Sequence, residues 1–152
     1  MVFRHFHPPG FGEQGLRHEV QVFVFRVTRA GLQYLLLRPL PRQESIWRPV
    51  VETVELDEDL FGAALRGVRN QTGLDHAFDL VAPAPGLVNE IGDLQLVEWP
   101  LGYQVRDPHV RLPRRAHLAA MAWKAFDDAL RTLPVDIHRQ NLLQIHWRLI
   151  AA

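Results

Sequence analysis

The apolar positions along the chain divide it into segments with the periods of strands and of helices. Residues 18–27 (HEVQVFVFRV) and 32–38 (LQYLLLR) are dense in β-branched and aromatic residues, which predicts two strands. The short link that ends at Gly31 predicts that the second strand returns antiparallel to the first. Pro39 and Pro41 are expected to end the second strand.

A helical period begins after the acidic cluster at residues 57–59. The apolar residues that share one helical face are Leu60, Phe61, Ala64, Leu65 and Val68. We expect the helix to begin near Asp59 or Leu60, because acidic side chains favour a helix N-terminus. Gly73 stands where a helix end is expected.

The second half of the chain predicts strands first and helices last. Short apolar segments near 78–82 and 94–105 are bounded by turn residues, and the pattern of 116–123 fits a helix or a strand equally. Residues 126–133 and 136–150 have helical patterns. This order predicts the α+β class, with a mixed sheet between helices on both of its faces.

Composition narrows the range of functions. Length and a hydrophobic content of 47% fit a single domain at 18–152, preceded by an irregular arm at 1–17 rich in Gly, Pro and His. A formal net charge of zero gives no general attraction to polyanions, so no nucleic-acid partner is predicted. The absence of cysteine excludes disulfides and a thiol nucleophile. No apolar run is long enough for a membrane span, and we expect a cytoplasmic protein.

The stretch WRPVVETVELDEDLFGAALRGVRNQTGL, residues 47–74, has the spacing of a known motif. It resembles the box of the Nudix hydrolase superfamily, G-x5-E-x7-R-E-U-x-E-E-x-G-U, in which U is a bulky apolar residue. The matching positions, including the lead-in before the box, are Trp47, Pro49, Glu58, Arg66, Val68, Gly73 and Leu74. Residues 117–130 are similar to the late strand and helix of many members. The alternative is an unrelated α+β domain that contains these residues by chance.

The resemblance implies a fold, an activity and a set of structural residues. The fold is an α/β/α sandwich. The activity is the Mg²⁺-dependent hydrolysis of a diphosphate linked to another moiety. Glu58, Arg66 and Gly73 would be structural, the first two by tying the loop before the helix to the helix.

The chain departs from the family pattern at the metal-binding positions. Glu52 replaces the opening glycine, whereas Gly67, Asn70 and Gln71 replace the three glutamates of the helix. Ala116 replaces a carboxylate that the family often has before its late strand. Positions 67, 70 and 71 lie within an arc of roughly 100° on a helix. That arc presents no carboxylate here, and Mg²⁺ prefers charged oxygen ligands. No catalytic residue, metal or cofactor is therefore assigned.

Our first hypothesis is a Nudix-like protein that has lost metal-dependent hydrolysis. It would serve as a binding or regulatory module for a nucleotide-like small molecule, and a phosphate-containing ligand is among the candidates. The candidate ligand-binding residues are Arg38, Arg48, Glu52, Gly67, Asn70 and Gln71.

Two other functions stay open. One is an atypical hydrolase that holds Mg²⁺ through Glu55, Glu58 or Asp59, although a solvated acidic loop explains the same residues. The other is a structural or partner-binding homodimer that uses the C-terminal helix around Trp147. A basic run at residues 106–115 suits phosphate contact, and an exposed loop explains it equally.

Overall fold

The computed structural model describes residues 16–41, 45–81, 87–91 and 93–151. The elements in chain order are β1 (Leu16–Thr28), β2 (Gly31–Pro39), β3 (Val50–Thr53), α1 (Leu60–Thr72), β4 (Ala77–Val81), β5 (Leu87–Ile91), β6 (Leu94–Val105), β7 (Leu118–Ala125), α2 (Phe126–Thr132) and α3 (Asp136–Ala151).

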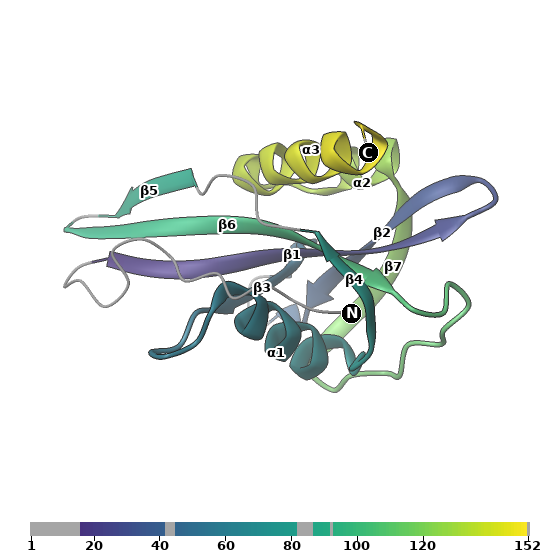
Figure 1. The fold of residues 1–152 in the computed structure, drawn as a ribbon, viewed down its shortest axis with the longest axis horizontal. Coiled ribbons are helices and arrows are strands. Elements are labelled where there is room, and N and C mark those ends of the chain that lie inside the picture. The colour runs from purple at the N-terminus through teal and green to yellow at the C-terminus, as the bar shows by residue number, and fades with distance from the viewer. Residues whose placement is uncertain (1–15, 42–44, 82–86, 92, 152) are drawn as a thin grey trace.

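The strands form one mixed sheet with the order β4-β6-β1-β2-β7, to which β3 adds on β1 and β5 on β6. The long central strands β1 and β6 are parallel, and the other pairs are antiparallel. Helix α1 covers one face of this sheet, and α2 and α3 cover the other (Figure 1). This architecture confirms the α+β class with a sheet between two helical layers.

Alternate side chains of β1 contribute to the hydrophobic cores on the two faces of the sheet. Val20, Val22 and Val24 belong to the cluster under α1, whereas Phe23 and Phe25 belong to the cluster under α2 and α3. Successive side chains of a strand point to opposite faces, so a continuous apolar run indicates a strand that is buried on both sides. The polar residues near the start of β1 follow the same alternation. Glu19 and Gln21 therefore lie on the face beneath α2 and α3.

The structure corrects several boundaries. β1 begins at Leu16, inside the arm expected at 1–17, and residues 1–15 lie outside the described residues. The ambiguous stretch 116–123 is a strand from Leu118, paired with β2. β3 and β5 were not predicted. Both are short, and β5 (LVNEI) mixes apolar and polar residues, so hydrophobic periodicity gave little signal for either.

Candidate functional site

The segment that resembles the Nudix box forms β3, the following loop and α1. Asp59 is the N-cap of α1, and its Oδ1 accepts a hydrogen bond of 2.6 Å from the backbone nitrogen of Gly62. Gly73 ends the helix in the left-handed region, at a φ of 82°, where a residue without a Cβ is favoured. Both ends of the helix are therefore set by the residues that the sequence indicated.

Arg66 is the centre of a cluster of acceptors beside α1. Its Nε and Nη2 donate to the two carboxylate oxygens of Glu58 at 2.9 and 3.0 Å, and Nη2 also donates to the carbonyl of Thr53 at 2.6 Å. Its Nη1 lies 3.2 Å from Oε1 of Glu52. These bonds join β3, the loop and the helix through one guanidinium.

The pKa directions agree with this geometry. Burial by itself would raise the pKa of the Glu58 carboxyl, but hydrogen bonds from Arg66 and the backbone hold it below its ordinary value. The hydrogen bonds to Glu58 raise the pKa of Arg66. The pair is therefore charged in the folded protein.

Glu52 and Gly67 are in direct contact. A Cβ placed on Gly67 would lie 2.8 Å from the Cβ of Glu52 and 3.3 Å from Cγ1 of Val50. The first distance is shorter than real Cβ contacts allow, so a side chain at position 67 and a glutamate at position 52 are incompatible without movement. The residues at these two positions are thus coupled by contact: the carboxylate stands on β3, and the glycine on α1.

Gln71 is held by the strand opposite it. Its Nε2 donates to the carbonyl of Val51 at 2.7 Å, and its Oε1 accepts from Nη1 of Arg48 at 2.9 Å. Asn70 lies on the exposed side of α1, where its carbonyl accepts from Nη2 of Arg115 at 2.7 Å. The structure therefore brings Arg48, Glu52, Gly67 and Gln71 together, and separates Asn70 from them.

These residues do not fit a resident Mg²⁺. The amide oxygen of Gln71 is occupied by a cation, and the carboxylates of Glu52 and Glu58 face the guanidinium of Arg66. Glu55 is mostly exposed, with Oε1 at 3.9 Å from Arg66. No group of three or more Asp, Glu or His side chains in the described part of the chain is placed to hold a metal ion. A divalent cation here would have to displace or face an arginine.

A separate basic group lies on the α2–α3 side of the sheet. The guanidinium carbon of Arg38 is 5.3 Å from the ring centroid of Trp47, and Nζ of Lys124 is 5.9 Å from the same centroid. In the β2–β7 register Arg38 pairs with Ala120 and Lys124 with Tyr34, so both cations stand on one face of the sheet. Neither cation forms a salt bridge with any residue that the structure describes.

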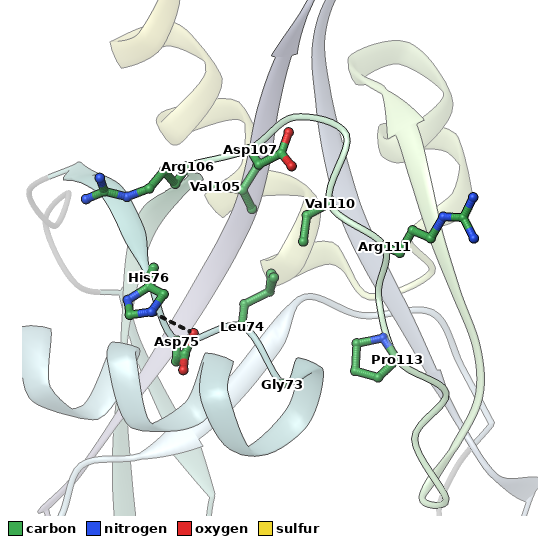
Figure 2. A pocket seen from close by; sticks show the side chains of 10 residues that line it. All are labelled: Gly73, Leu74, Asp75, His76, Val105, Arg106, Asp107, Val110, Arg111 and Pro113. Atoms are coloured by element: carbon green, nitrogen blue, oxygen red, sulfur yellow. Dashed lines mark ion pairs between the residues drawn. The ribbon is translucent and has the colours of Figure 1, made fainter.

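The basic run at 106–115 borders a cavity. A cavity of about 270 Å³ lies between the C-terminal end of α1 and the connection from β6 to β7. Leu74, Val110 and Pro113 face this space, whereas the guanidinium groups of Arg106 and Arg111 point away from it in opposite directions (Figure 2). The cavity wall is therefore mostly apolar, and phosphate contact by this run stays a prediction.

Solved structures share this arrangement of elements over nearly the whole chain. The dihydroneopterin triphosphate pyrophosphohydrolase of E. coli is 19% identical with a TM-score of 0.72, covering 98% of this chain and 100% of its own. The Ap4A hydrolase of C. elegans is 16% identical with a TM-score of 0.67, covering 90% and 99%.

A third match is described explicitly as a Nudix domain. It is the NUDIX domain of Shewanella oneidensis NrtR in complex with ADP ribose, which is 17% identical with a TM-score of 0.70 and covers 95% of this chain and 94% of its own. This chain has the Nudix fold. No protein-family model matches its sequence, and no curated protein matches it either. At these identities the likeness establishes the Nudix fold alone, because activity depends on the residues of the site.

Within the Nudix fold, sequence reasoning missed several polar residues opposite α1. Besides Lys124 they are Glu19, Gln21, Glu98, His138 and Asn141, four of which are buried. A signal was present, because Glu19 and Gln21 interrupt an apolar run at alternate positions, and Asn141 and His138 share one side of a helix. That signal indicates a shared face but no role.

Two predictions concern surfaces beyond the site. Trp147 is 63% exposed on α3, and Leu143 and Ile150 are exposed at the spacing of the same helical stripe, so the homodimer stays a prediction. None of the described helices has the length and hydropathy of a membrane span.

Proposed function

We propose that this Nudix-fold protein has lost metal-dependent diphosphate hydrolysis and binds a nucleotide-like small molecule as a ligand-binding or regulatory module. The observation that supports the proposal is that a glutamate and a glycine have exchanged places between β3 and α1. Glu52 stands where the family has a glycine, and Gly67 stands where the family has a metal-binding glutamate. Their contact leaves no space for a side chain at position 67.

The charge balance supports the same conclusion. In the family, glutamates of this helix bind a metal cation. In this chain, the nearest carboxylates, those of Glu52 and Glu58, instead form ion pairs with Arg66. Placing Mg²⁺ among them would bring two cationic groups together and would also break hydrogen bonds that join the loop to the helix.

The ligand is expected to carry negative charge. Arg38 and Lys124 lie beside the ring of Trp47 without a carboxylate partner among the described residues, so an aromatic surface and two cations are close together. Arginine and lysine suit phosphate groups, and an indole ring suits a planar base. The related Nudix domain of NrtR in complex with ADP ribose is an example of a nucleotide-type ligand on this fold.

The experiment measures binding and turnover separately. The purified protein is titrated calorimetrically with ADP-ribose, nucleoside monophosphates and nucleoside triphosphates in EDTA, and the same compounds are incubated with Mg²⁺ or Mn²⁺ to detect released phosphate or monophosphate. We expect binding in EDTA and no turnover. Metal-dependent turnover that Glu58→Gln abolishes in a folded protein would instead establish the hydrolase alternative.

A reconstructed site gives the positive control. Gly67→Glu alone would clash with Glu52, so the variant combines it with Glu52→Gly, Asn70→Glu and Gln71→Glu. We expect this fourfold variant to bind Mn²⁺, measured by the loss of the free-ion signal in electron paramagnetic resonance, at concentrations where the wild type binds none. Equal Mn²⁺ binding by both proteins would contradict the proposed loss of the metal site.

A further inference from the structure

The cavity between the end of α1 and the β6–β7 connection opens at the surface, although its walls are mostly apolar. Its volume is about 270 Å³. Three segments of the chain supply the apolar side chains that line it, which are Leu74, Val105, Val110 and Pro113 (Figure 2). Leu74 follows α1, Val105 ends β6, and the other two belong to the connection. Leu74, Val110 and Pro113 face the space and leave it open between them.

Hydrogen bonds within the protein hold these walls in place. The backbone nitrogen of Leu74 donates to Oγ1 of Thr72 at 3.2 Å, which fixes the turn after α1. Nη1 of Arg26 on β1 donates to the carbonyl of Pro108 at 3.0 Å, which ties the connection to the sheet. The cavity is therefore formed before any ligand arrives, and a preformed site loses less conformational entropy on binding.

The charged residues that line the cavity offer no partner to a charge placed inside it. The guanidinium groups of Arg106 and Arg111 point away from the space (Figure 2). Oδ1 of Asp75 lies 3.5 Å from Nε2 of His76, and both side chains are exposed. Oδ1 of Asp107 accepts a hydrogen bond from the backbone nitrogen two residues later. An ionised group inside the cavity would lose its water without gaining an opposite charge.

We propose that this cavity binds an uncharged, apolar group of one or two fused rings, for which indole is a suitable probe. An apolar cavity of roughly 150 Å³ holds benzene, and sites for drug-sized molecules begin at about 300 Å³, so a volume between these fits one or two rings. A ring in this position contacts all three segments and removes their apolar surface from water.

This site is independent of the nucleotide-like function. Its described lining residues include none of the candidate ligand-binding residues on β2, β3 and α1. A molecule with a charged phosphate group is expected at the cations beside Trp47, whereas an uncharged ring is expected here. The two ligands are therefore tested with different compounds.

The first experiment compares two probes that share one ring system and differ in charge. The full-length protein is titrated with indole and with indole-3-carboxylate, and binding is followed by calorimetry. We expect indole to bind about tenfold more tightly or better, because the carboxylate must either enter an apolar space or keep the ring partly outside it. In carbon–proton correlation spectra of the wild type, indole should shift the methyl resonances of Leu74, Val105 and Val110.

A substitution that fills the cavity gives the second readout. Val110→Phe places a ring of the protein in the space that Val110 faces, so we expect indole affinity to fall about tenfold or more. Val27→Phe is the matched control, because Val27 is 52% exposed and lines a different cavity, on the β1–β2 turn. The control should leave indole affinity unchanged. The methyl shifts of the wild type test the site even if Val110→Phe fails to fold.

Three results would overturn the inference. They are equal affinities for indole and indole-3-carboxylate, a loss of indole binding in Val27→Phe but not in Val110→Phe, and unchanged methyl resonances of Leu74, Val105 and Val110 at saturating indole. The nucleotide titrations in EDTA decide the proposed function separately. A protein that binds indole and no nucleotide retains this site and overturns that function, whereas one that binds a nucleotide and no indole does the reverse.

Discussion

Two polar clusters lie on opposite faces of the sheet, one beneath α1 and the other beneath α3. Beneath α1, each polar group described above has a partner: Arg66 binds Glu58 and Glu52, and Gln71 binds both Arg48 and the backbone of Val51. Beneath α3, the hydrogen-bond chain from Asn141 through Gln21 to Glu98 leaves acceptor atoms without a described partner.

The difference between the two clusters indicates which polar groups are free to form hydrogen bonds with a ligand. Paired groups stabilise the fold and have little capacity left for a ligand, because any new contact must first break an existing one. Unpaired buried groups cost stability, and a binding partner can recover that cost. The polar groups of the Arg66 and Gln71 clusters beneath α1 are therefore already used within the fold, whereas those beneath α3 retain unused hydrogen-bonding capacity.

The largest expected effect is the loss of the guanidinium beneath α1. Arg66→Met leaves the Glu58 and Glu52 carboxylates without their cation, and we expect the free energy of unfolding to fall by about 3 kcal/mol. Urea denaturation measures this change, with Arg69→Met on the exposed side of α1 as the control.

The effect of Arg66→Met should also depend on pH. The pKa of Glu58 is lowered in the folded state, so the pair stabilises the protein above the ordinary glutamate pKa of 4.5 and loses this contribution as the pH falls through the folded value. The difference between wild type and Arg66→Met should therefore shrink in acid. A difference below about 0.5 kcal/mol at pH 7 would show that this face is not held together as described.

The second prediction tests the contact between strand and helix. Gly67→Ala should gain about 1 kcal/mol from helix propensity, but the clash with Glu52 costs about 1–3 kcal/mol, so the net effect is a loss of stability. In a Glu52→Gly background the contacts with Glu52 are absent and only the 3.3 Å contact with Cγ1 of Val50 remains, so the same substitution should destabilise the protein less or stabilise it. A double-mutant cycle measured by urea denaturation checks this difference. Additive effects would mean that positions 52 and 67 vary independently.

The sequence predicted the α1 face far better than the α3 face, for a physical reason. Helix α1 and its pairing arginine are local: Asp59, Glu58, Arg66 and Gly73 lie within one short segment, where spacing along the chain approximates spacing in the fold. Gln21 and Asn141 are hydrogen-bonded across most of the chain length. Only the pairing of β1 with β6 and the docking of α3 bring such residues together, and no local period encodes them.

The smallest effect concerns Glu19 at the edge of the α3 cluster. Its pKa is raised from 4.5 to about 7, mainly by burial and then by the charges of Glu98 and Glu52, with Arg48 opposing them. Between these values the unfolded chain releases a proton that the folded protein retains. The contribution of Glu19 to stability should therefore be highest below a pH of about 4.5, fall as the pH rises to about 7, and stay low at higher pH.

Glu19→Gln should remove part of this decline, so the variant should gain stability over the wild type as the pH rises from 5 to 8. Thermal unfolding across that range measures the difference, and His138, whose pKa is lowered to about 4 by burial and then by Arg48, stays neutral throughout it. If the two stability curves stay parallel from pH 5 to 8, Glu19 does not share the charge of this cluster, and the contrast between the two faces is limited to the hydrogen-bond chain of Asn141, Gln21 and Glu98.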